Sequence, residues 1–300
     1  MNNMEKNEIE DWMIAGRIAG ETREYARSLI KPGASMLAVA EKIEEKIALL
    51  GAVPAFPVNL SLNDTAAHYS PIPGDTLLFS DQLVKVDVGV CYNGAIGDTA
   101  CTIDLSGKYS DMIKASEEAL SNALKIMVPG TRIGNIGKTI METIASYGYS
   151  PIKNLSGHGL GRYNVHDKPS IPNFDTGDSA VLSDGMHVAI EPFATDGAGM
   201  IKESSNAMIF SQVKARPVRS QFAREVLADL QGYKGLPFAS RWLARKHGDG
   251  KTRIAIRDLL QAGILREYPP LIEVRKGFVT QAEHSVIVME KPVVTTRWPE

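Results

Sequence analysis

The stretch from Val84 to Asp104, VKVDVGVCYNGAIGDTACTID, constrains the fold more than any other part of the chain. Asn93-Gly94 is a preferred two-residue hairpin turn, and the flanking runs are rich in Val, Ile, Thr and Cys. Because side chains alternate along a strand, such a turn places Asp87 and Asp98 on one face as diagonal neighbours, roughly 7–8 Å apart at the backbone. A slip of one residue would put them on opposite faces. The stretch therefore predicts a β-hairpin with two neighbouring carboxylates.

This pair of carboxylates has two interpretations. Carboxylates so close together repel each other and share a proton unless a cation lies between them. Asp is depleted in strand interiors, so the pair is either the exposed polar face of an edge hairpin or part of a cation site. The hairpin alone does not separate these alternatives.

Length and composition bound the class of protein. The chain has 300 residues, of which 44% are hydrophobic and 23% charged, as expected for one large soluble domain or one domain with a smaller companion. The net charge of −2 predicts no general attraction to DNA or to a membrane. Cys91 and Cys101 are not opposite each other in the hairpin, and the polar N-terminus has no apolar signal segment. These features predict a cytoplasmic protein without a disulfide framework.

Hydrophobic periodicity predicts the elements around the hairpin. Two helices are expected within residues 5–50, and Ser35 is the expected N-cap of the second. Residues 52–73 contain several prolines and are expected to be irregular and partly extended, with His68 among them. Further helices are predicted over 110–127 and 134–147, and further strands over 186–193 and 278–289.

A change of charge marks residues 208–271. This segment has 12 Lys and Arg against five Asp and Glu, a net charge of +7, whereas the rest of the chain has −9. The segment is expected to contain short helices over 220–231, 240–246 and 251–262, followed by a turn-rich tail over 263–270. We therefore predict an inserted, helical, winged-helix-like subdomain. His247, which ends its second helix, is expected to be exposed.

Five polar residues occupy strand or glycine-rich positions where a polar or charged side chain costs free energy unless it has a partner. They are Asp87, Asp98, His158, Glu191 and Glu283. Glycines around His158 let the backbone approach a ligand closely, and Pro192 keeps Glu191 extended. Glu283 lies in an apolar run, where an unpaired carboxylate is expensive to bury. Four carboxylates and one imidazole form a ligand set for two divalent cations. Oxygen-dominated ligation with one histidine favours Co, Mn, Fe(II) or Zn.

The order and context of these five residues closely resemble those of the methionine aminopeptidases, members of the pita-bread metallopeptidase family. The matching motifs are KVDVGV at Asp87, GDTA at Asp98, GHGLG at His158, AIEPF at Glu191 and EH at Glu283. The resemblance runs over nearly the whole chain. The insertion before Glu283 points to the type 2 branch, and the lack of an N-terminal extension resembles its archaeal members.

The resemblance implies an α/β (α+β) pita-bread fold, in which helix pairs lie on a curved antiparallel sheet. Residues 1–207 and 272–300 would form the catalytic domain, and residues 208–271 would form the inserted subdomain. It also implies a monomer that removes the initiator methionine from nascent proteins whose second residue is small.

The resemblance assigns a role to each ligand. Asp87 would bind the first metal, Asp98 and Glu283 would bridge both metals, and the second site would be completed by His158 and Glu191. A bridging hydroxide would attack the carbonyl after the first residue, with Glu191 as the carrier of the water's proton.

Further residues would contact the substrate. His166 would lie near the scissile amide and stabilise the tetrahedral intermediate. His68 would lie over the first-residue site and assist binding or proton delivery. An apolar pocket for the methionine side chain would involve Phe56, Val165 and Tyr268.

Alternative functions stay open at this point. Proline-specific peptidases of the same fold use a similar ligand set, although they usually have an additional N-terminal domain. Catalytically inactive relatives bind RNA or protein partners, although they typically lack some of the ligands. The basic insertion could also contact ribosomal RNA through Arg241, Arg245 and Lys246, which are within about one helical turn of each other. A solvated lid, or a wall of the substrate pocket, explains the same charge.

Overall fold

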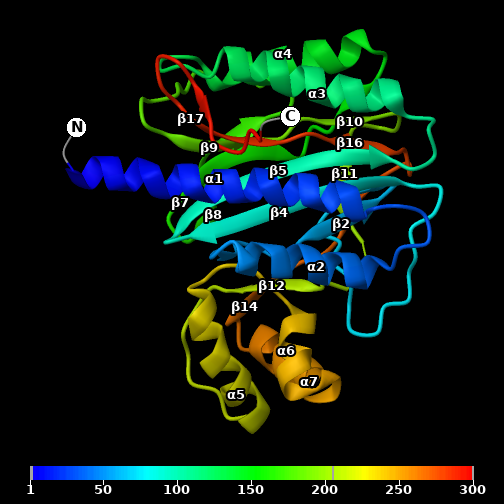
Figure 1. The fold of residues 1–300 in the computed structure, drawn as a ribbon, viewed down its shortest axis with the longest axis vertical. Helices are drawn as coiled ribbons and strands as arrows, with labels where there is room; N and C mark the ends of the chain where they lie inside the picture. Colours follow the sequence, from blue (N-terminus) through cyan, green and yellow to red (C-terminus); the bar gives the residue numbers. More distant parts are fainter. Residues whose placement is uncertain (1–2, 205, 299–300) are drawn as a thin grey trace.

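The computed structural model of the protein describes residues 3–204 and 206–298. Four helices cover a layer of strands, and they are α1 (Asn3–Leu29), α2 (Met36–Leu49), α3 (Ser110–Lys125) and α4 (Ile133–Ser146). α1 and α2 contact strands of the first half, and α3 and α4 contact strands of the second half (Figure 1). Ser35 caps α2 as predicted, because its Oγ accepts a hydrogen bond from Ala38 N at 3.3 Å. Among the helices in these two ranges, none is long and apolar enough to cross a membrane.

The predicted hairpin forms in the predicted register. β4 (Leu83–Tyr92) pairs with β5 (Ala95–Asp104) through a turn at Asn93-Gly94, where both residues have positive φ (51° and 92°) as a type I′ turn requires. The valines of β4 pack in the core beneath α1 and α2. On the opposite face Lys85 and Asp98 are buried as well, at 1% and 2% exposure. The interpretation of this face as the exposed polar side of an edge hairpin is therefore wrong.

The second half contains a five-stranded sheet in the order β18-β17-β9-β7-β8. Its strands are β7 (Ser156–Gly161), β8 (Asn164–Pro172), β9 (His187–Ile190), β17 (His284–Ile287) and β18 (Val293–Val294). α3 and α4 pack on this half through a core of its own, which includes Ile140, Val188 and Val286. Each half thus consists of a helix pair on antiparallel strands.

Two predictions, 186–193 and 278–289, are wrong as continuous strands. The first divides into β9 and β10 (Phe193–Thr195), and the second divides into β16 (Val279–Gln281) and β17. β10 pairs with β16 and with β6 (Ser150–Pro151) in a separate three-stranded sheet.

Each of these breaks coincides with a predicted ligand. Pro192 has no N–H to donate to a ladder, so regular pairing stops beside Glu191. Glu283 donates its N–H to Ala100 O of β5 at 3.0 Å. Both glutamates therefore lie where the backbone leaves one sheet for another.

The two halves meet along a seam, in which hydroxyl side chains take the place of a regular backbone ladder. Thr102 Oγ1 donates to Gln281 O at 2.7 Å and accepts from Gln281 N at 2.8 Å. Ser285 Oγ likewise donates to Asp98 O and accepts from Asp98 N, each at 2.8 Å. The seam, defined by Thr102 and Ser285, holds β5 against β16 and β17.

Short strands occupy the stretch that was expected to be irregular. The strands around it are β1 (Val53–Pro54), β2 (Asn59–Leu62), β3 (Thr65–Ala67), β11 (Ile201–Glu203) and β15 (Leu271–Glu273). β1 and β2 pair with β4, and β3 joins β15 and β11 in a small sheet. His68 follows β3 directly with φ 65°, in the left-handed region.

The segment 208–271 contains the three predicted helices, and it lies below α2 in Figure 1. Its elements are β12 (Ile209–Gln212), α5 (Gln221–Leu230), η1 (Gln231–Tyr233), β13 (Phe238–Ala239), α6 (Ser240–His247), α7 (Asp249–Gln261) and β14 (Leu265–Tyr268). The prediction of a turn-rich tail over 263–270 is wrong, because β14 pairs with β12 in a three-stranded sheet of order β13-β12-β14. An apolar cluster that includes Phe210, Leu243 and Leu259 joins the helices to this sheet.

Two expectations for α6 are wrong. Arg241 was expected on a basic surface, but it is 2% exposed and pairs with Glu44 of α2. His247 was expected to be exposed, but it is half-buried and its Nε2 lies 2.7 Å from Asp229. Lys246 binds the same carboxylate at 2.6 Å. The helix therefore uses its basic residues to hold neighbouring elements.

Candidate active site

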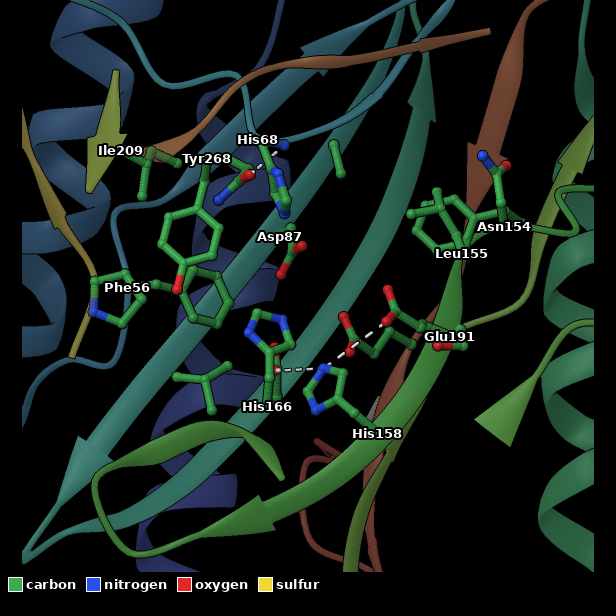
Figure 2. Close-up of a pocket in the computed structure, with 18 residues that line it drawn as sticks. Phe56, His68, Asp87, Asn154, Leu155, His158, His166, Glu191, Ile209 and Tyr268 are labelled. Atoms are coloured by element: carbon green, nitrogen blue, oxygen red, sulfur yellow. Dashed lines mark hydrogen bonds and ion pairs between the residues drawn. The ribbon is translucent and has the colours of Figure 1, made fainter. Parts of the chain in front are cut away.

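One pocket of about 200 Å³ brings together all ten site residues predicted from the sequence. They are Phe56, His68, Asp87, Asp98, His158, Val165, His166, Glu191, Tyr268 and Glu283. Figure 2 shows Phe56, His68 and Tyr268 on one side of the pocket, and Asn154 and Leu155 on the other.

The five predicted ligands come from both halves of the molecule. Asp87 and Asp98 come from β4 and β5, because the hairpin register directs both to one face. His158 lies on β7, and Glu191 and Glu283 lie at the two strand breaks. The ligands therefore converge where the halves meet.

A compact group of ligand atoms lies at the bottom of this pocket. Asp98, His158 and Glu283 each offer one ligand atom, and these atoms all lie within 4.8 Å of one another. His158 Nε2 is 3.8 Å from Asp98 Oδ2 and 3.8 Å from Glu191 Oε1 (Figure 2). Gln281 Nε2 lies within 3.5 Å of Asp87 Oδ2 and 3.3 Å of Glu191 Oε2. Asp98, Glu191 and Glu283 thus lie around one imidazole, and Gln281 links Glu191 to Asp87.

Burial perturbs every one of these groups. It raises the pKa of Asp87 to about 7. Burial and the neighbouring carboxylates together raise the pKa values of Asp98, Glu191 and Glu283 well above their usual range. Burial lowers the pKa of His158 to about 3, so its imidazole is neutral at pH 7 and is free to act as a ligand.

The donor set fits a divalent metal ion. Asp87 Oδ1, Asp98 Oδ1 and Glu283 Oε2 are buried and have no hydrogen-bond partner within the described residues. Buried carboxylate oxygens without partners are costly, and a cation between them removes that cost. Oxygen ligands with one imidazole suit Mn, Fe(II), Co or Zn better than Cu(I).

Two more histidines face the ligand group. The ring centroid of His166 lies 4.6 Å from that of His158, and 6.4 Å from that of Tyr268. The ring of His68 lies 5.8 Å from Tyr268, edge to face. Burial lowers the pKa of both histidines, to about 4 for His68. Both rings are therefore neutral at pH 7 and can donate or accept one hydrogen bond at each nitrogen.

The apolar lining of the pocket combines Phe56, Val165 and Tyr268 with residues that the sequence did not single out, namely Leu155, Phe193, Ile209 and Pro237. Gly89 is part of this arrangement, because a Cβ at that position would lie 2.1 Å from the Phe56 ring. Phe193 was within reach of sequence reasoning, since it stands in the AIEPF motif. Ile209 and Pro237 gave no signal, because only docking of the insertion brings them to the pocket.

Residues 11–215 match metallopeptidase family M24. The chain is 46% identical over 293 residues to a protein named methionine aminopeptidase from Thermococcus onnurineus, with 97% of this chain and 99% of that protein covered. The chain belongs to the M24 metallopeptidases, among the methionine aminopeptidases. The predicted membership of the methionine aminopeptidases and the predicted α/β pita-bread fold are thus confirmed. This M24 chain is a metal-dependent hydrolase.

Solved structures agree with this fold. A methionine aminopeptidase from Thermotoga maritima matches this M24 chain with a TM-score of 0.69 at 24% identity, covering 97% of both chains. A prolidase from Pyrococcus furiosus matches with a TM-score of 0.62 at 21% identity, covering 98% of this chain but 65% of the prolidase. The prolidase therefore has a substantial part to which nothing in this chain corresponds.

Proposed function

We propose that the chain is a methionine aminopeptidase that removes the initiator methionine from nascent proteins with a small second residue. The observation that supports this most directly is the pocket itself. Its apolar side, with Phe56, Val165 and Tyr268, adjoins the carboxylates around His158. A volume of about 200 Å³ suits one apolar side chain rather than a folded or extended peptide.

The five residues Asp87, Asp98, His158, Glu191 and Glu283 would hold two divalent ions, with Co, Mn, Fe(II) and Zn all compatible with the ligands. Asp87, Asp98 and Glu283 would help to hold these ions, which is supported by the buried carboxylate oxygen that each leaves without a hydrogen-bond partner among the described residues. When bound, two divalent ions lower the pKa of a water molecule and polarise the scissile carbonyl.

The protein's own groups would move the proton and bind the reacting amide. Glu191 is the proposed proton carrier, because its carboxylate lies beside the ligand group, with Oε1 3.8 Å from His158 Nε2, and a carboxylate can take a proton and return it. His166 would donate a hydrogen bond to the carbonyl oxygen as negative charge develops. His68, with Nδ1 buried and unpartnered among the described residues, would bind the first residue or assist proton delivery.

The organisation of the chain is part of the same proposal. Residues 1–207 and 272–300 would form the catalytic domain, and 208–271 the winged-helix-like insertion, whose own apolar cluster supports the division. We expect a cytoplasmic monomer. Ribosome contact through the insertion rests on its net charge of +7 alone, and it cannot use Arg241, which is buried.

The proposal is tested by stripping the protein of metal and adding back Mn, Fe(II), Co or Zn with the peptide Met-Ala-Ser. Methionine should be released only with metal, and a Glu191→Ala variant should release none. Calorimetric titration should show two equivalents of metal. Metal binding with cleavage of an Xaa-Pro dipeptide instead of Met-Ala-Ser would favour the proline-specific alternative. A chain that binds no metal would be an inactive relative.

A further inference from the structure

Arg241 belongs to α6 of the insertion, but its side chain is buried against the body. Its Nη2 pairs with Glu44 Oε1 of α2. Its Nη1 donates to Ser70 Oγ at 2.6 Å and approaches Pro71 O at 3.4 Å. Trp242, the next residue, donates from Nε1 to Glu44 Oε2 at 2.8 Å. One carboxylate of the body therefore receives two consecutive side chains of the insertion.

These contacts converge on Val58, a core residue that lies in the chain between the pocket residues Phe56 and Asn59. Val58 N donates to Glu44 Oε1 at 3.3 Å, and Val58 O accepts from Ser70 Oγ at 2.9 Å. Both groups that hold Val58 are also bound by Arg241. Glu44, Val58, Ser70 and Arg241 thus form a closed ring of hydrogen bonds, which we name the Val58 ring.

The Val58 ring holds the segment from Phe56 to His68, which contributes Phe56, Asn59, Ala67 and His68 to the pocket. Asn59, next to Val58, accepts from His68 N through Oδ1 at 2.6 Å and donates from Nδ2 to Pro57 O at 2.8 Å. His68 has φ 65°, which is uncommon for a residue other than glycine and persists only where the surroundings impose it. The position of His68 therefore depends on the backbone that the Val58 ring holds, and so does that of Phe56 on its other side.

The chemistry of the ion pair favours a geometric role. Replacing a buried ion pair by apolar residues is often neutral or stabilising, so such a pair is weak evidence for stability. Only a planar guanidinium reaches a carboxylate and a hydroxyl from separate nitrogens in fixed directions. Arg241 matches this requirement, because Nη1 and Nη2 bind different partners on two elements of the body.

We propose that Arg241 is a positioning residue for the substrate end of the site. Through Glu44, Ser70 and Val58 it fixes the segment that presents Phe56 and His68, and so couples the insertion to substrate binding without touching the metal ligands. The inference rests on the proposed function, in which Phe56 and His68 contact the first residue of the substrate.

The test compares Arg241→Met, Arg241→Lys and Ser70→Ala with Arg245→Met. Arg245 is a matched control, because it lies one turn further along α6 and its pair with Glu41 is exposed, at 55% and 39% for the two side chains. Ser70→Ala keeps the buried ion pair and removes the hydroxyl that joins Arg241 Nη1 to Val58 O, so it covers the case in which the Arg241 variants fail to fold. Three quantities are measured on folded protein well below its Tm. They are metal stoichiometry and affinity, kcat and KM for Met-Ala-Ser, and the rate at which diethyl pyrocarbonate modifies His68, followed by mass spectrometry.

Arg241→Lys, Arg241→Met and Ser70→Ala should each lower kcat/KM by on the order of tenfold or more and change the modification rate of His68, with metal binding unchanged. The Ser70→Ala and Arg241→Met effects should be non-additive in the double variant, because both act through the same ring. Arg245→Met should behave as the wild type. A lower Tm with wild-type KM and wild-type His68 reactivity would overturn the inference. If the wild-type protein releases no methionine, the proposed function fails, and the His68 reactivity still decides whether Arg241 positions this segment.

Discussion

Removing the metal should make the stability of the fold fall with rising pH above pH 7. Burial raises the pKa of Asp87 to about 7 and, with the neighbouring charges, raises the pKa values of Asp98, Glu191 and Glu283 further above their usual range. In the unfolded chain all four titrate near pH 4. A carboxyl whose pKa is raised by folding stabilises the folded state below its unfolded pKa, and this contribution is lost as the pH rises through the folded pKa.

The size of the effect follows from the number of retained protons. Each carboxyl that stays protonated in the folded state while the unfolded chain is ionised contributes about 1.4 kcal/mol per pH unit. Over any pH unit, a carboxyl contributes a loss of up to this size for as long as it keeps its proton in the folded state, and Asp87 loses its proton near pH 7. His68 and His158 do not contribute here, because burial lowers their pKa values to about 4 and about 3, and unfolded histidine is neutral above pH 7. Burial lowers the pKa of Lys85, which gives an effect of opposite sign with or without metal.

The assay is urea unfolding at pH 7.0, 7.5 and 8.0, with saturating Mn(II) and with chelator. The Lys85 contribution is common to both conditions and cancels in the difference between the two free energies of unfolding. That difference should grow as the pH rises from 7 to 8, by up to about 1.4 kcal/mol per pH unit for each carboxyl that keeps its proton without metal. Calorimetry in buffers of different ionisation enthalpy should detect protons released on metal binding. A difference that does not change with pH, together with no proton release, would refute the assignment of the four carboxyls to one cation site.

Three substitutions test the architecture around the site. Gly89→Ala should displace the Phe56 ring, because the added methyl would lie 2.1 Å from it; urea unfolding should show a loss of about 1–3 kcal/mol and kinetics a higher KM for Met-Ala-Ser. Thr102→Val should leave Gln281 N unpaired in the seam and cost about 1–3 kcal/mol by the same measurement, and an unchanged stability would contradict the role of that hydroxyl. Glu273→Gln should cost about 2 kcal/mol at pH 7, because this buried carboxylate accepts several backbone N–H groups. Burial opposes ionisation of Glu273, but those bonds lower its pKa, so its contribution is present above its unfolded pKa and the difference from the variant should shrink as the pH falls below about 4.

The part of the site that depends on the alternation of side chains along a strand could be predicted from the sequence. The Asn93-Gly94 turn determines the register of the hairpin, and the register places Asp87 and Asp98 on one face. His158 was marked by its glycines, and Glu191 by the proline that follows it. These are local signals, in which the residues that decide the geometry are close together in the chain.

What the sequence did not predict depends on contacts between distant segments. The breaks at Glu191 and Glu283 arise because the chain passes from one sheet to another, whereas the period of the side chains continues through both. Arg241 looked like an exposed base because its helix is basic, and its burial depends on docking against α2. Ile209 reaches the pocket for the same reason. Periodicity reports the faces of an element and says nothing of its tertiary partner.

The seam gives the order of synthesis a consequence for activity. Asp87 and Asp98 belong to the part of the chain that is made first, whereas His158 and Glu191 follow later, and Glu283 lies close to the C-terminal end. A growing chain that has completed only its first half has two of the five ligands, Asp87 and Asp98. Ser285, which binds the backbone of Asp98 across the seam, has not yet been made. The complete ligand set is assembled only once β17 docks, so the chain acquires the means to cut a peptide bond only after Glu283, the last of the five ligands in the sequence, has been made and folded into place.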